Sequence, residues 1–211
     1  MLAFALLLMA APVIALLAAV VYASSSGPAL IRLPRVGQGG RSFGMWKLRT
    51  MYHAPRASGA PLTSAGDARI TRTGRVLRRL HLDELPQLAN VVLGDMALIG
   101  PRPETPELVD QADARWRDVL AARPGIVGPT QMVVRRREGE VVATAGEDGY
   151  RNLILPAKLA IDAWYVSQAS PRLDALVVRS LLQELRIGRG LHALERRVGG
   201  EVAEAGGLLS R

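Results

Sequence analysis

The most informative part of this chain is the stretch Asp83-Glu84-Leu85-Pro86-Gln87-Leu88-Ala89-Asn90, followed by Gly94-Asp95-Met96-Ala97-Leu98-Ile99-Gly100-Pro101-Arg102-Pro103. Leu85, Leu88, Val91 and Val92 have helical spacing, so the stretch predicts a helix from Asp83 to Leu93. Gly94 is a natural stop, because glycine readily adopts the left-handed conformation that ends helices. Met96 to Ile99 then predict a short buried strand that delivers Gly100-Pro101-Arg102-Pro103.

Two adjacent carboxylates, Asp83 and Glu84, stand at the expected start of this helix. Pro86 belongs in a first helical turn, which places the start near Asp83. Acidic residues in that position commonly cap a helix and complement its dipole. The same position also suits chemistry on a phosphate, because a helix N-terminus attracts anions. Both interpretations are compatible with the local pattern.

Arg102 lies between two prolines just after the expected strand. Pro101 and Pro103 fix the backbone φ on both sides, so the guanidinium is presented from a stiff extended segment to a planar anionic target. The alternative is a proline-rich turn with a solvent-exposed arginine.

Upstream, Gly37 to Gly40 predict a hairpin turn between two short strands, the second of which leads into Lys47-Leu48-Arg49-Thr50-Met51. Lys47 and Lys158 are the only lysines in a chain that otherwise uses arginine for positive charge. A lysine in this motif favours a site that needs a compact ammonium, with chance codon usage as the alternative.

The remaining body of the chain predicts three more helices and two irregular segments. Val76, Leu77 and Leu80 mark one helix face, with Arg75, Arg78 and Arg79 mainly off it, suited to solvent, anionic lipid or phosphate. Residues 156–168 predict a helix, and residues 171–185 an amphipathic helix that packs on the core or lies in a membrane interface. Residues 54–66 predict a mobile loop, and residues 187–211 a weakly ordered tail.

The N-terminal residues 1–23 carry no charge. As a helix they would extend for about 35 Å at about 1.5 Å per residue, enough to cross a bilayer. Pro12 stands at the midpoint and predicts a break or kink there. A plain spanning helix, a cleaved signal peptide and a helix-break-helix that enters and leaves the same leaflet all remain open on this pattern.

Composition narrows the class of partner. The chain has 27 basic and 19 acidic residues, a net charge of +8, which favours a phosphate-rich partner. Aromatic residues make up only 4% of the chain, which argues against the stacking platform of a nucleic-acid binder. The absence of cysteine excludes disulfides and thiolate metal sites, and three scattered histidines do not indicate a zinc site.

Together these motifs, over about residues 5–186, resemble the bacterial sugar transferases, the monotopic phosphoglycosyl transferases. The resemblance rests on Arg35-Val36-Gly37, the segment from Lys47 to Met51, the Asp83 to Pro103 stretch, and Arg123-Pro124-Gly125-Ile126 with Gln131. It implies an enzyme that moves a sugar phosphate from a UDP-sugar to a polyprenyl phosphate. It also makes the re-entrant helix the leading interpretation of residues 1–23, with Pro12 as the membrane break.

The resemblance further implies roles for individual residues. Asp83 corresponds to the nucleophile, which forms a phosphosugar-enzyme with release of UMP, and Glu84 to a Mg²⁺ ligand. The implied substrate-binding residues are Lys47, Arg49, Arg78, Pro101, Arg102, Pro103, Arg123 and Gln131.

We therefore expect an α+β fold in which a re-entrant membrane helix, residues 1–23, precedes a catalytic domain, residues 24–186, with amphipathic interfacial helices. The domain would lie on the cytoplasmic face of the inner membrane and contact lipid, with UDP-sugar and polyprenyl (undecaprenyl) phosphate as substrates, Mg²⁺ as cofactor and no nucleic acid. Ala11 in place of the family's serine and the altered segment 128–131 leave an inactive family member as one alternative. A membrane-tethered basic adaptor protein is the other.

Overall fold

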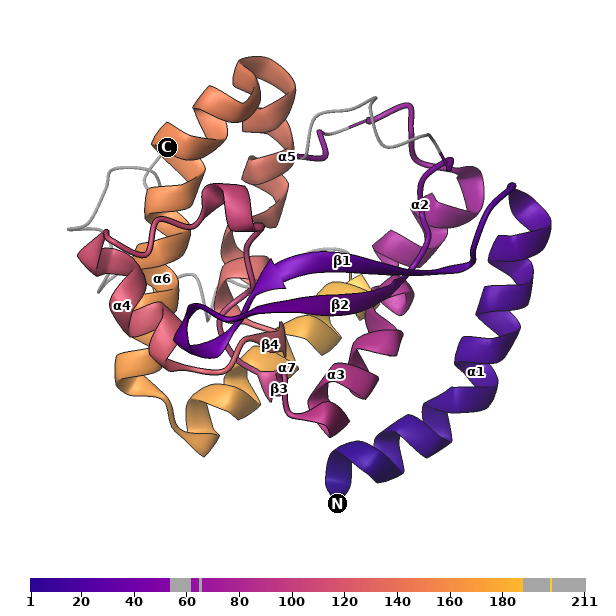
Figure 1. Ribbon diagram of the computed structural model, residues 1–211, viewed down its shortest axis with the longest axis horizontal. Coiled ribbons are helices and arrows are strands. Elements are labelled where there is room, and N and C mark those ends of the chain that lie inside the picture. Colours follow the sequence, from indigo (N-terminus) through magenta and orange to yellow (C-terminus); the bar gives the residue numbers. More distant parts are fainter. Residues whose placement is uncertain (54–61, 65, 188–197, 199–211) are drawn as a thin grey trace.

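The computed structural model describes residues 1–53, 62–64, 66–187 and 198 (Figure 1). Its first element, α1 (Leu2–Ser24), is one helix that continues through Pro12 and changes direction along its length (Figure 1). Proline lacks the N–H that would bond one turn back and its ring crowds that carbonyl, so a bend without an end to the helix is the expected response. The sequence predicted a break or a kink here: the break is wrong, because the helix is continuous, and the ribbon of α1 curves along its length (Figure 1).

The hairpin predicted around Gly37 to Gly40 is confirmed. Strands β1 (Leu30–Val36) and β2 (Ser42–Leu48) pair antiparallel, with Leu30 opposite Leu48 and Val36 opposite Ser42. The short 3₁₀ turn η1 (Gln38–Gly40) joins them, and Gly39 and Gly40 have φ of 67° and 75° there. Glycine adopts such values without strain, which is why the turn falls on this cluster.

The helix expected from Asp83 to Leu93 is present as two pieces. It follows α2 (Arg72–Arg79) and consists of a 3₁₀ turn, η2 (Leu82–Gln87), and a short α-helix, α3 (Leu88–Leu93). Pro86 has no N–H to donate, so the first part adopts the tighter geometry. Gly94 ends α3 with φ of 87°, as predicted.

The strand expected at Met96 to Ile99 is β3 (Ala97–Ile99), which pairs parallel with β4 (Gly125–Val127). Its three residues are half-buried, so the prediction of a buried strand was wrong apart from the preceding Met96, which is 1% exposed. A two-stranded sheet leaves its strands only partly covered. The Gly125 N–H donates to the Pro101 carbonyl at 2.8 Å and so fixes the start of the Pro-Arg-Pro segment.

The rest of the domain is helical and holds the larger core. It comprises η3 (Pro106–Leu108), α4 (Ala114–Ala121), α5 (Pro129–Gly149), the π-turn η4 (Tyr150–Ile154), α6 (Leu155–Gln168) and α7 (Pro171–Ile187). The predicted α6 and α7 are confirmed, whereas α4 and α5 were not predicted. Leu173 and Val177 of α7 are buried in the core, so this helix packs on the domain. The expected loop 54–66, except 62–64 and 66, and the expected tail, except Ile187 and Val198, lie outside the described residues.

A second, smaller core joins α1 to the domain. Val21, Leu48 and Leu77 pack together from α1, β2 and α2. In Figure 1, α1 runs beside α2 and α3, while α4, α5 and α6 lie on the other side of the hairpin.

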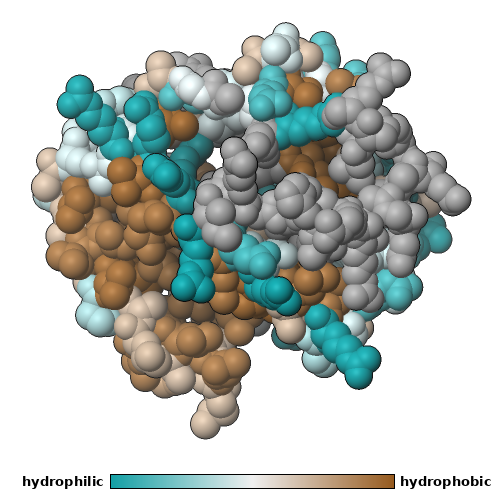
Figure 2. All heavy atoms as spheres, turned by 180° about the vertical axis from the view of Figure 1, so that it is seen from behind, coloured by the Kyte–Doolittle hydropathy of each residue, from teal (hydrophilic) through white to brown (hydrophobic). Residues whose placement is uncertain are grey.

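Most of α1 faces outward. Among the described residues, α1 is the one helix that is both long enough and apolar enough to cross a bilayer. Only 6% of its most apolar 18-residue stretch is buried. Figure 2 shows the hydrophobic surface to which the exposed side chains of α1 contribute. Helices α2 and α3, which contact α1, expose the apolar side chains of Val76, Val92 and Leu93, and Leu80 directly after α2 is exposed as well. A surface of this kind marks a membrane or protein contact.

Candidate active site

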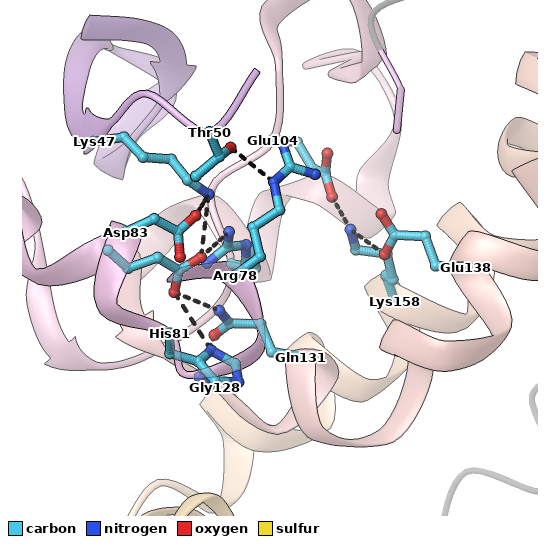
Figure 3. Close-up of polar contacts among 12 residues, drawn as sticks. Lys47, Thr50, Arg78, His81, Asp83, Glu104, Gly128, Gln131, Glu138 and Lys158 are labelled. Carbon is cyan, nitrogen blue, oxygen red and sulfur yellow. Dashed lines mark hydrogen bonds and ion pairs between the residues drawn. The ribbon is translucent and has the colours of Figure 1, made fainter. Parts of the chain in front are cut away.

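Asp83 and Glu84 lie together in η2, almost enclosed by the domain. Asp83 is 2% exposed and Glu84 is 8% exposed. Lys47, at the end of β2, reaches both: its Nζ lies 2.8 Å from Asp83 Oδ2 and 3.6 Å from Glu84 Oε1 (Figure 3). Asp83 Oδ2 has no hydrogen bond to another described residue, so Lys47 contacts it as an ion pair outside hydrogen-bonding geometry. A carboxylate oxygen held this way keeps its lone pairs available.

Arg102 completes the positive charge around Glu84. Its Nη2 donates to Glu84 Oε1 at 2.7 Å. Burial by itself would raise the pKa of Glu84, but Arg102, His81 and Lys47 hold it well below its usual range. The pKa of Arg102 is raised in spite of its burial, because Glu84 favours the charged guanidinium. Arg102 Nη1 is buried without a hydrogen-bond partner among the described residues, so it remains a donor for an incoming anion.

Gln131 and His81 lie next to the second carboxylate oxygen of Glu84, Oε2. Gln131, in the first turn of α5, accepts from the Gly128 N–H at 2.8 Å and directs its Nε2 to Glu84 Oε2 at 3.4 Å. His81 Nδ1 lies 4.0 Å from the same oxygen. His81 has φ of 56°, an unfavourable value for a side-chain-bearing residue, and it directly precedes η2. Sequence reasoning did not select His81, because this backbone strain has no local sequence signature.

The structure brings some of the predicted substrate-binding residues to the carboxylates and takes others elsewhere. Lys47, Arg102 and Gln131 contact Asp83 or Glu84. Arg78 donates from Nε to Thr50 Oγ1 at 2.8 Å (Figure 3).

Two of the predicted residues have other partners. The Arg49 guanidinium does not point to the carboxylates; it binds the C-terminal end of α1. The role of Arg49 in substrate binding stays a prediction: Nη1 and Nη2 bind the segment at the end of α1, and Nε is buried without a hydrogen-bond partner among the described residues. Arg123 donates to Gln38 Oε1 at 3.4 Å on an exposed surface.

A second buried polar group supports the segment that follows Arg102. Lys158 of α6 forms an ion pair with Glu104 and lies 3.5 Å from Glu138 Oε2 (Figure 3). The Tyr150 hydroxyl donates to Glu104 Oε1 at 2.8 Å. Burial opposes the charge on both partners, yet Lys158 lowers the pKa of Glu104 and Glu104 raises the pKa of Lys158. None of these residues was selected from the sequence as part of a site.

Asp162 lies next to this group. The Thr130 hydroxyl donates to its Oδ1, and Asp162 is 3% exposed. Burial raises the pKa of Asp162 to about 7, against the effects of Thr130, Lys158 and the Arg102 backbone N–H. Arg102 thus contacts Glu84 with its side chain and Asp162 with its backbone N–H.

The carboxylates fit a Mg²⁺ ion that is shared with a phosphate ligand. Mg²⁺ prefers oxygen donors and is commonly held by one or two carboxylates together with substrate phosphates. Asp83 Oδ2, which lacks a hydrogen bond, and the adjacent Glu84 supply such donors. The described residues contain no cluster of three or more acidic, histidine or cysteine side chains able to hold a metal alone. The ion would therefore need further ligands from substrate or water.

As a whole, the arrangement suits chemistry on a phosphate group. It offers buried carboxylate oxygen as a nucleophile or metal ligand, an ammonium and a guanidinium to offset negative charge, and a free guanidinium donor. A carboxylate meets a phosphate with a repulsion of about 4 kcal/mol per charge pair at about 4 Å and an effective dielectric constant of about 20. The cations around Asp83 and Glu84 counter that repulsion.

Comparison with known proteins agrees with this chemistry. A sequence profile of the bacterial sugar transferases matches residues 1–185. Over 184 residues the chain is 37% identical to a UDP-N-acetylgalactosamine-undecaprenyl-phosphate N-acetylgalactosaminephosphotransferase of Aeromonas hydrophila, covering 85% of this chain and 40% of that protein. It is 44% identical over 125 residues to a UDP-glucose:undecaprenyl-phosphate glucose-1-phosphate transferase of Caulobacter vibrioides, covering 58% of this chain and 47% of the relative.

A relative of similar length also matches. Over 192 residues the chain is 32% identical to the exopolysaccharide production protein PSS of Rhizobium leguminosarum bv. phaseoli, covering 87% of this chain and 91% of that protein. The chain thus spans less than half the length of the first two relatives and nearly all of the third. The profile match over most of its length shows that the chain belongs to the bacterial sugar transferase family.

Proposed function

We propose that this protein is a phosphoglycosyl transferase that moves a hexose-1-phosphate from a UDP-sugar to undecaprenyl or a similar polyprenyl phosphate. The single observation that carries the proposal is the pair of buried carboxylates, Asp83 and Glu84, with Lys47 and Arg102 at their oxygens. A helix cap needs neither this burial nor these cations. The substrates named for the Aeromonas and Caulobacter relatives support the two substrate classes.

In the first step a carboxylate oxygen of Asp83 attacks the phosphorus that carries the sugar. The new Asp83–phosphorus bond forms as the bond from that phosphorus to the bridging oxygen breaks, and UMP leaves with the bonding electron pair. In the second step an oxygen of the polyprenyl phosphate attacks the same phosphorus. The bond to Asp83 breaks, the carboxylate is regenerated, and the product is a polyprenyl diphosphate sugar.

The surrounding residues have distinct tasks in this scheme. Lys47, 2.8 Å from Asp83 Oδ2, offsets the repulsion between the Asp83 carboxylate and the diphosphate. Arg102 fixes Glu84 through Nη2 and offers its unpaired Nη1 to a phosphate oxygen. Gln131 orients the second oxygen of Glu84. When bound by Glu84 and substrate oxygens, Mg²⁺ would supply further stabilisation of negative charge.

The membrane arrangement is part of the same proposal. We infer that α1 is embedded in the cytoplasmic leaflet of the inner membrane as a bent, re-entrant element, with the catalytic domain on the cytoplasmic face. The curved course of α1, the position of Pro12 within it and its exposed apolar length support this placement. The polyprenyl phosphate would then present its phosphate at the headgroup level. The product would start a lipid-linked glycan, such as an exopolysaccharide.

The test is incubation of the purified chain with Mg²⁺, polyprenyl phosphate and a panel of UDP-sugars, with the nucleotide product identified. Release of UMP indicates transfer of a sugar phosphate, whereas UDP indicates ordinary glycosyl transfer. Neither product, with every sugar in the panel, would contradict the proposal and favour an inactive or adaptor protein. Asp83→Asn should abolish the release of UMP. Asp118→Asn, at an exposed aspartate of α4, is the matched control for this variant and should retain parental activity.

A further inference from the structure

Arg49 is buried at the C-terminal end of the membrane helix. It is 4% exposed, although it carries a full charge. Its Nη1 donates to the Ser26 carbonyl at 2.5 Å, and its Nη2 donates to the Ser25 carbonyl at 2.6 Å and, more weakly, to the Val21 carbonyl at 3.3 Å. Ser25 Oγ accepts a further bond from Nη2 at 3.1 Å. One guanidinium therefore holds the end of α1 and the two residues that follow it.

The identity of these partners indicates what the arginine does. The last carbonyls of a helix have no partner within the helix and carry partial negative charge. The last turn of α1 contains no basic residue of its own. Arg49 supplies the missing cation from a distant part of the chain, and none of its described partners is a carboxylate. Nη1 and Nη2 are thus matched to the end of α1, while Nε is buried without a hydrogen-bond partner among the described residues.

The chain leaves room for this contact at Gly27. A Cβ at Gly27 would fall against Arg49 Nη1 and the His53 side chain, and Gly27 also has φ of 105°. A residue with a side chain would therefore be strained at this position and would displace the guanidinium. The position of the Arg49 guanidinium therefore depends on glycine at position 27.

The same short segment connects α1 to the carboxylates. Lys47 contacts Asp83, and Leu48 packs between Val21 of α1 and Leu77 of α2. Arg49 then binds the end of α1. The segment leaves little freedom between the membrane helix and the catalytic carboxylates, because each of these three consecutive residues is anchored.

We propose that Arg49 is a positioning residue that fixes α1 relative to the active site and so sets where the lipid acceptor meets Asp83. This inference rests on the proposed function for the identity of the acceptor. It predicts that a change at Arg49 affects the reaction with one substrate and not with the other. The UDP-sugar half-reaction depends on the carboxylates and their cations, whereas the acceptor half-reaction depends also on the placement of α1.

The test compares Arg49→Met and Arg49→Lys with the parent, and Arg115→Lys, at a 62% exposed arginine side chain of α4, serves as the control. In the Arg49 variants the KM for polyprenyl phosphate should rise by about tenfold or more, as expected when charge-assisted hydrogen bonds are lost. The KM for UDP-sugar and the single burst of UMP without acceptor should stay within about twofold, because the first half-reaction does not use this contact. Gly27→Ala should reproduce the same division with Arg49 in place.

A second measurement does not depend on turnover. The chain has no cysteine, so Leu8→Cys and Arg79→Cys can carry spin labels on exposed positions of α1 and α2. In lipid nanodiscs the interspin distance distribution should be narrow in the otherwise native protein and clearly broader with Arg49→Met. Equal losses for both substrates, or unchanged acceptor KM and distances, would overturn the positioning role. Failure of the parent to release UMP would remove the proposed function instead, and the distance measurement would still decide whether Arg49 fixes α1.

Discussion

Lys158→Met is expected to destabilise the domain strongly, because it leaves the Glu104 carboxylate buried without its cation. The Lys158 side chain is 8% exposed and that of Glu104 is 10% exposed. Removal of one partner from a buried ion pair costs about 3–5 kcal/mol. For a chain of this size each kcal/mol lowers Tm by about 2–4 °C, so the loss should be about 6–20 °C.

The assay is thermal unfolding of the detergent-purified protein at pH 7, with two matched variants. Arg115→Met breaks an exposed pair with Asp113, and solvent-exposed pairs contribute little to stability, so its Tm should fall by less than about 4 °C. The double variant Lys158→Met/Glu104→Gln removes both charges and keeps a partner for the Tyr150 hydroxyl, so it should recover more than half of the loss. A Tm shift of Lys158→Met no larger than that of Arg115→Met, or a further loss in the double variant, would show that Lys158 does not stabilise the domain by pairing with Glu104.

Three other predictions concern the same molecule. The pKa of Asp162 in the folded protein, about 7, lies above its ordinary value of 3.8, so the unfolded chain loses this proton first and stability falls as the pH rises from about 4 to about 7. Asp162→Asn should therefore raise Tm relative to the parent at pH 8, and by less at pH 5. A Tm difference that does not change with pH would contradict this prediction. Glu84→Gln should raise the Mg²⁺ concentration needed for half-maximal UMP release, and an unchanged titration would assign the metal to other groups. An Ala3→Cys variant should resist an impermeant periplasmic thiol reagent in intact cells, whereas Pro12→Ala in the same protein should expose it to labelling; labelling with Pro12 present would indicate a spanning helix.

Local patterns predicted the parts of the fold that depend on neighbouring residues. The glycine cluster fixed the hairpin turn, Gly94 ended α3, and the apolar spacing identified α6 and α7. The resemblance grouped Lys47 and Arg49 as substrate-binding residues, but only Lys47 contacts the carboxylates. Strand β2 ends at Leu48, between the two residues, and Arg49 donates to the segment at the end of α1.

Long-range pairs were beyond the reach of the sequence alone. Lys158 of α6 forms an ion pair with Glu104, 54 positions earlier in the chain, and neither residue has a local pattern that indicates a buried partner. Helix α5 was missed for a different reason. Pro129 at its start and Gln131 three residues after Gly128 are recognisable start signals, but the charged run at 135–137 and Gly139 hide any apolar periodicity.

The most direct test of the proposed chemistry is mass spectrometry of the chain after incubation with Mg²⁺ and UDP-sugar in the absence of polyprenyl phosphate. The account predicts one added sugar phosphate on the peptide that contains Asp83, release of one equivalent of UMP, and loss of the adduct when polyprenyl phosphate is added. Asp83→Asn should give neither adduct nor UMP while it keeps its fold. UMP release by Asp83→Asn within about tenfold of the parent, or an adduct on another residue, would contradict the assignment of Asp83 as nucleophile.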